Sequence, residues 1–212
     1  MKLSTLSVIL GLVVAVPNAY GLFRPAAFAA AARKFPRHAL LGYPLMLAAT
    51  AWFLHNLSQE AVADFLSFKP GLYILFGGVG VGACIFVRDF LPVRGLAVLL
   101  LLLAKLMVDT ARWVDTDWRL VMATWAYVLV LAGMWFTVSP WRLRDLIHWA
   151  TASDQRTRLL SSLRLAFGLF VLALGLTVYR AAEHRAPTAL QAATAVTLSQ
   201  HGGPPSAGMP SP

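Results

Sequence analysis

The sequence has little of what a soluble enzyme usually contains. Only 13% of its 212 residues are charged, nine residues are acidic, and Cys84 is the single cysteine. Soluble domains carry about 25% charged residues, so this composition argues against a water-soluble globule. One cysteine cannot form an intramolecular disulfide, and a lone thiol in an apolar segment most often behaves as a small apolar side chain.

Residues with catalytic spacing are also missing. None of the five histidines lies inside an apolar run, and no two have the spacing of zinc or haem ligands; they are His38, His55, His148, His184 and His201. We find no nucleophile–base pair and no phosphate-binding fingerprint. The sequence therefore predicts no metal and no cofactor and favours a non-enzymatic protein over an enzyme, and a lipid-modifying enzyme ranks third, behind the non-enzymatic alternatives.

Long apolar runs are what the sequence does contain, since 58% of its residues are hydrophobic. The runs are continuous rather than alternating, which favours helices over a transmembrane barrel. Six stretches approach the length of about 20 residues that a bilayer requires. We therefore expect an all-α, polytopic membrane domain over residues 1–185, with six transmembrane helices in three hairpins at about residues 6–22, 39–54, 70–87, 95–113, 120–138 and 159–179.

The segments between these runs suggest short helices at the membrane surface. In Trp141–Ala150 the apolar residues follow a helical period and the charged residues lie on the other face, as expected for an interfacial helix. The Ala-rich segment Pro25–Phe35 and the segment 61–66 have similar patterns. Residues 186–212 are rich in Pro, Ala, Gly and Ser, which predicts a disordered tail.

The net charge of +9 is distributed unevenly between the two sides of the expected membrane domain. Ten basic residues fall in the loops after the first, third and fifth runs, against six on the opposite side. The positive-inside rule then places both termini outside the cytoplasm, in a bacterial inner membrane. We expect anionic headgroups and other membrane subunits as partners rather than nucleic acid, with the candidate headgroup contacts Arg33, Lys34, Arg142 and Arg144.

The first run permits a second interpretation. Met1-Lys2, an apolar core and the small residues of Ala19-Tyr20-Gly21 also match a secretory signal peptide. Cleavage there would leave five spans and would place the four following basic residues outside the cytoplasm, against the positive-inside rule. We favour a retained first helix.

One part of the chain resembles a known family. SPWRLRDLIHWATASDQRTRLLSSLRLAFGLFVLALGLTVYR, preceded by an apolar span, is similar to the small two-helix YjeT-type inner-membrane family. The shared features are a basic amphipathic helix and an Arg-led second span that contains glycines and ends in Tyr-Arg. The family's turn is Pro-(x)-Arg-Trp-like, whereas the order here is Pro140-Trp141-Arg142. The resemblance covers about residues 125–180 and implies membrane location and topology only, because the family has no established chemistry.

The strongest local hint of function is a pair of charges inside the fourth apolar run. Lys105 and Asp109 lie four residues apart, on one face of the expected helix, and Arg112 follows three residues later. A charge at bilayer depth costs at least ~2.5–3.5 kcal/mol. The pair is either a structural ion pair near a wet boundary or a site that exchanges protons or binds an ion.

Glycines in the third run predict close helix packing, through the small-xxx-small spacing of Gly78 and Gly82. Together with the missing catalytic groups, this pattern favours a non-enzymatic accessory or scaffold subunit of a membrane complex. The alternative is a small ion- or proton-coupled transporter that uses Lys105 and Asp109.

Overall fold

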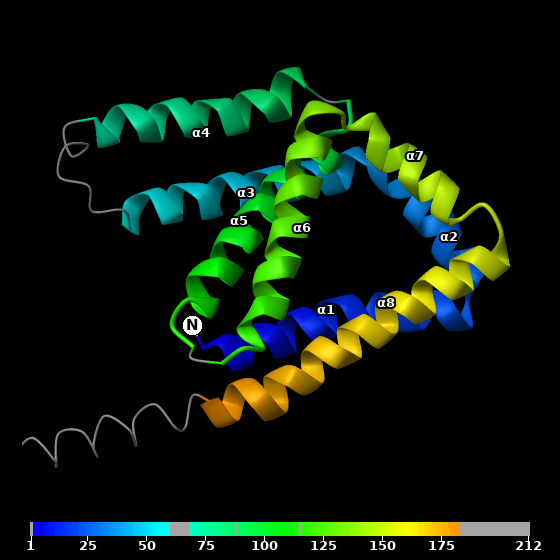
Figure 1. Ribbon diagram of the computed structural model, residues 1–212. Helices are drawn as coiled ribbons and strands as arrows, with labels where there is room; N and C mark the ends of the chain where they lie inside the picture. The colour runs from blue at the N-terminus through cyan, green and yellow to red at the C-terminus, as the bar shows by residue number, and fades with distance from the viewer. Residues whose placement is uncertain (1, 60–67, 88, 115, 183–212) are drawn as a thin grey trace, which may run out of the picture.

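The computed structural model describes residues 2–59, 68–87, 89–114 and 116–182, and all regular structure within these ranges is helical (Figure 1). The helices are α1 Leu3–Phe23, α2 Pro25–Lys34, η1 Phe35–Arg37, α3 Ala39–Gln59, α4 Lys69–Phe86, α5 Leu91–Ala111, α6 Arg119–Val138, α7 Trp141–Ala150 and α8 Asp154–Leu174, which continues into the π-helical turn η3 Gly175–Tyr179. The segment 61–66 and the tail 186–212 lie outside the described residues.

Five of the described helices are long and apolar enough to cross a membrane: α1, α4, α5, α6 and the continuous helix from α8 through η3. The sixth expected span is also a helix, α3, with 21 residues, but it is not among these five. The all-helical fold and the membrane class are therefore confirmed. The number of spans stays a prediction.

α1 and α8 form the most extensive contact between helices, and they lie side by side in Figure 1. They are antiparallel, because Ser7 lies beside Gly175, Gly11 beside Gly168, and Gly21 beside Ser161. Small side chains at these positions allow the two backbones to approach closely, which is how helices associate without a hydrophobic driving force in lipid. The first apolar run is thus paired with the last.

The remaining long helices pack around α5. α6 lies antiparallel to α5, with Gly133 against Leu101. α3 runs parallel to α5, because Gly42 abuts Leu91 and Gly95 abuts Met46. α4 contacts α3, where Gly80 packs on Thr50 and the rings of Phe53 and Phe76 lie 4.7 Å apart.

The α1/α8 and α5/α6 pairs share one hydrophobic core, and it lies at one end of the bundle. The first halves of α1 and α6, the second half of α5, and the last turns of α8 and η3 supply its side chains. The buried residues of this core include Leu3, Leu6, Leu10, Ala104, Met107, Met122, Ala126, Val171, Leu174 and Tyr179. The Tyr179 hydroxyl donates to the carbonyl of Trp118 at 2.8 Å. Core contacts and this bond hold the two pairs together where α1 begins and α8 ends.

At the opposite end, α2 and α7 connect the same pairs. Arg33, near the end of α2, donates from Nε to Thr151 Oγ1 at 2.9 Å and from its guanidinium to the Thr151 carbonyl. Thr151 directly follows α7, so the Arg33 side chain also supplies hydrogen-bond donors to the C-terminal end of that helix. α8 begins after Ser153, whose Oγ accepts a bond from the backbone N–H of Arg156 at 3.2 Å.

Candidate functional site: the Lys105–Asp109 pair

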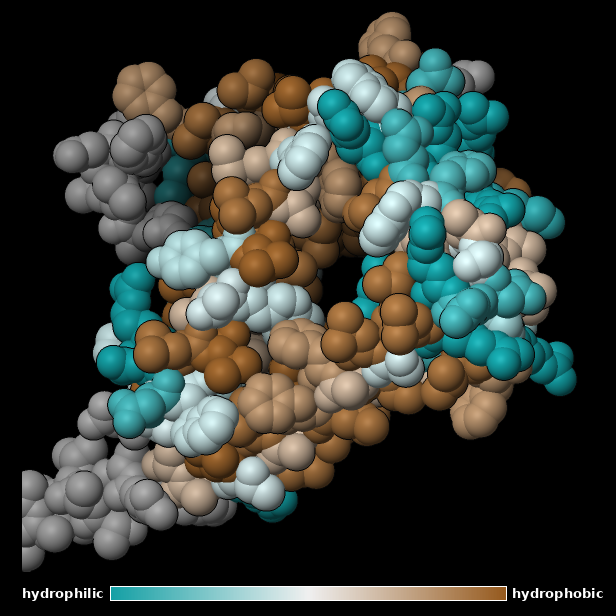
Figure 2. Space-filling view, turned by 45° about the vertical axis from the view of Figure 1, so that its right-hand side comes forward, coloured by the Kyte–Doolittle hydropathy of each residue, from teal (hydrophilic) through white to brown (hydrophobic). Residues whose placement is uncertain are grey.

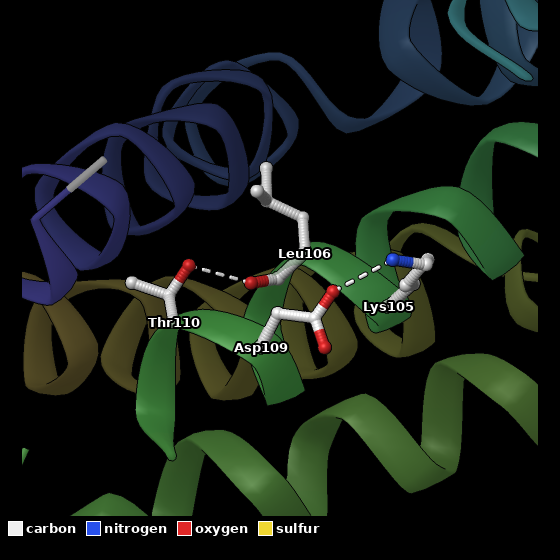
Figure 3. A network of polar contacts seen from close by, with 4 residues as sticks. All are labelled: Lys105, Leu106, Asp109 and Thr110. Atoms are coloured by element: carbon white, nitrogen blue, oxygen red, sulfur yellow. Dashed lines mark hydrogen bonds and ion pairs between the residues drawn. The ribbon is translucent and has the colours of Figure 1, made fainter. Parts of the chain in front are cut away.

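α5 positions the two charges predicted from the sequence one helical turn apart. Lys105 Nζ and Asp109 Oδ2 are 2.8 Å apart, as Figure 3 shows. The side chains are 48% and 47% exposed within this chain, so the protein itself does not bury them. Arg112 is exposed where α5 ends. The expected juxtaposition of Lys105 and Asp109 is therefore present, on the surface of the helix bundle.

Each member of the pair lines a different hollow. Asp109 and Thr110 line one of about 400 Å³, together with Lys2 and Leu3 from the start of α1. Lys105 lines the other, of about 340 Å³, which lies between α3, α4 and α5 and has mainly apolar walls. Thr110 Oγ1 donates to the carbonyl of Leu106 at 2.6 Å and so continues the polar row along α5 (Figure 3).

The ion pair lets the Lys105 ammonium and the Asp109 carboxylate neutralise each other. An (i, i+4) ion pair lowers the cost of placing an ammonium and a carboxylate near lipid, because each supplies the counter-charge of the other. The residues that the structure describes contain no group of three or more His, Cys, Asp or Glu side chains able to hold a metal ion. Asp109 pairs with Lys105 and lines a hollow to which Lys2 also contributes.

The glycines of α4 differ sharply in their surroundings. A Cβ at Gly80 would collide with Thr50, so this glycine carries the contact with α3. A Cβ at Gly78 or Gly82 would meet nothing within 4 Å. The predicted packing surface is therefore open in the single chain, and its role in helix packing stays a prediction about another molecule.

The four candidate headgroup contacts fall at the α2/α7 end of the bundle. Lys34 and Arg142 are exposed. Arg33 holds Thr151, and Arg144 pairs with the neighbouring Asp145 at 2.8 Å. Two of these residues thus present their charge to the surroundings, while the other two also have partners within the chain.

Sequence reasoning missed the close contact between α1 and α8. Its signal was present in the small residues Gly11 and Ala15 of α1 and in Gly168 and Gly175, seven residues apart in the last run. It also missed Asn18, which is buried in α1 and donates from Nδ2 to the carbonyl of Val14 at 2.7 Å.

Comparison with known proteins identifies no relative. No family model, curated protein or solved structure matches this chain. Any function assigned to this membrane protein must therefore come from its own residues.

Proposed function

We propose that this integral membrane protein is a non-enzymatic scaffold or accessory subunit, and that α4 docks on a transmembrane helix of a partner subunit. In this proposal α3 is the sixth span, and consecutive spans are joined as three hairpins that do not pack as pairs, since α1 packs on α8 and α5 on α6. Both termini lie outside the cytoplasm of a bacterial inner membrane, and the basic α2/α7 end lies inside. The loop charges support this orientation, and the YjeT-type resemblance of residues 125–180 supports the location.

The observation that carries the proposal is the low burial of α4, which contacts only α3 extensively among the described residues. Only 11% of this span is buried, against 44% of α5. Its contact with α3 uses Gly80, whereas Gly78 and Gly82 lie open, four residues apart. Such a spacing lets a second helix approach to backbone contact. Glycine costs helix stability of about 0.5–1 kcal/mol relative to alanine, so open glycines in a helix are best explained by a close-fitting partner.

The test is to block this surface without disturbing the fold. We expect the Gly78→Leu/Gly82→Leu variant to keep the thermal stability of the parent, because a Cβ at either position meets no described residue within 4 Å and leucine favours a helix more than glycine does. After mild detergent extraction from native membranes, the parent should migrate as a complex well above its 23.0 kDa, and the variant as the single chain. The control is Val128→Leu on the exposed face of α6, which should leave the complex intact.

Two results would overturn the scaffold proposal. The first is a parent protein that is monomeric after extraction from its native membrane. The second is a complex that survives the double leucine substitution.

A transport function is the alternative, and one observation favours it. Asp109 lines a hollow of about 400 Å³ that Lys2 and Thr110 make polar. A proton- or ion-coupled transporter needs such a carboxylate to bind and release its ion. If the protein reconstituted in liposomes carries protons or ions across the membrane, and if Asp109→Asn abolishes this flux without changing the fold, a transport function is supported over the scaffold.

A further inference from the structure

The α1/α8 and α5/α6 pairs separate toward the α2/α7 end. Their shared core is built from the opposite end, by residues such as Leu6, Met107 and Val171. Figure 2 shows the consequence: an opening that passes between the helices, with apolar side chains along its lower edge. Exposed apolar side chains on the separated halves include Val16, Leu131 and Leu163.

The same end of the bundle carries a concentrated positive charge. Segments 24–38 and 139–158 contain eight Arg and Lys residues and two Asp residues. Figure 2 shows this hydrophilic surface above and to the right of the opening. The bond from Arg33 to Thr151 joins α2 to α7 and so fixes the two basic segments beside each other. Lys34, Arg142 and Arg158 are exposed.

We propose that this opening binds one anionic phospholipid, with its acyl chains between the α1/α8 and α5/α6 pairs and its phosphate against the basic surface of α2, α7 and the start of α8. The apolar side chains along the opening favour an apolar occupant, because covering apolar surface is favourable. The basic part requires an anionic group at its edge. A phospholipid combines both, and basic pockets between transmembrane helices are typical headgroup sites.

The site depends on the membrane location of the protein and is independent of the partner proposed for α4. It also gives α2 and α7 a specific role. By tying the two helices together, Arg33 sets the distance between the basic segments that hold the headgroup.

Native mass spectrometry of the delipidated protein tests this site. When phosphatidylglycerol or phosphatidylcholine is added back, we expect one phosphatidylglycerol to bind per chain, at least about tenfold more tightly than phosphatidylcholine. The Lys34→Gln/Arg142→Gln/Arg158→Gln variant should bind phosphatidylglycerol on the order of 100-fold more weakly, since each basic residue near the surface contributes about 1 kcal/mol. The charge-matched control Arg112→Gln/Arg119→Gln/Arg180→Gln changes the opposite end and should bind like the parent.

A competition arm separates a lipid site from a simple anion site. Glycerol phosphate carries the headgroup chemistry without acyl chains, and we expect it not to displace the bound lipid. Displacement by glycerol phosphate, a statistical series of bound lipids, equal affinity for the two phospholipids, or equal loss in both triple variants would each overturn the proposal. Thermal unfolding of every variant confirms that the fold is retained. Because the measurement uses the isolated chain, it is unaffected by failure of the scaffold proposal.

Discussion

Substitution of Gly168 by alanine should separate α1 from α8. A Cβ at this position would lie 2.9 Å from the backbone nitrogen of Ala15 and 3.0 Å from the carbonyl oxygen of Gly11. Both neighbours are backbone atoms, so no rotamer change can relieve the contact and the two helices must move apart. Overpacking of this kind costs about 1–3 kcal/mol.

A gain in helix stability opposes this loss. Replacing a helical glycine by alanine contributes about 0.5–1 kcal/mol of helix stability. The two ranges leave an expected net loss for Gly168→Ala of about 0–2.5 kcal/mol in the free energy of unfolding, or about 1 kcal/mol at their midpoints. Gly82→Ala is the matched control, because it makes the same chemical change where nothing lies within 4 Å. It should leave stability unchanged or raise it by up to about 1 kcal/mol.

Unfolding of the detergent-solubilised protein by sodium dodecyl sulfate, followed by tryptophan fluorescence, measures both variants. If Gly168→Ala is as stable as Gly82→Ala, the close α1–α8 contact does not exist in the protein. The same experiment bears on the first helix. A mature N-terminus at Leu22 would remove most of α1 and leave Gly168 without its neighbours, so N-terminal sequencing should accompany the measurement and should find α1 present.

Three further changes test other contacts. A double-mutant cycle of Lys105→Leu and Asp109→Leu should give a coupling free energy of about 0.3–0.5 kcal/mol, the value for exposed (i, i+4) pairs. A coupling of about 3–5 kcal/mol would show that lipid or a partner buries the pair. Arg33→Ala should increase hydrogen exchange at Thr151 and the end of α7, whereas unchanged exchange would contradict the role of this bond. Tyr179→Phe should lose about 1 kcal/mol in the same unfolding assay, and a neutral result would show that its hydroxyl bond is not formed.

The helices were largely predictable because their signals are local. The segment Trp141–Ala150 is a helix with the predicted bounds, and α2 differs from its expected range by one residue. The apolar runs are helices whose ends differ from expectation by a few residues. α5 begins at Leu91, so Arg94 lies inside the helix rather than in the preceding loop. Pro92 in the first turn permits this early start, since proline fits the first positions of a helix.

Helix pairing was not predictable because it depends on complementary surfaces far apart in the chain. Gly11 and Gly168 are 157 residues apart, and only their meeting explains why each is glycine. Similarly, the sequence placed Lys105 and Asp109 on one helix face, but it could not establish which way that face points. Exposure of about one half for each side chain became visible only once the neighbours of α5 were placed.

The glycines therefore carry two different kinds of information. In α1 and α8, Gly11 and Gly168 each pack against backbone atoms of the opposite helix within the same chain. In α4, Gly78 and Gly82 have the spacing of a packing surface, and no described residue lies within 4 Å of a Cβ built at either position. Both regions have small residues spaced along one helix. They differ in whether another helix of the same chain packs against those residues. This contrast makes α4, rather than the charged pair on α5, the strongest argument for a partner in the membrane.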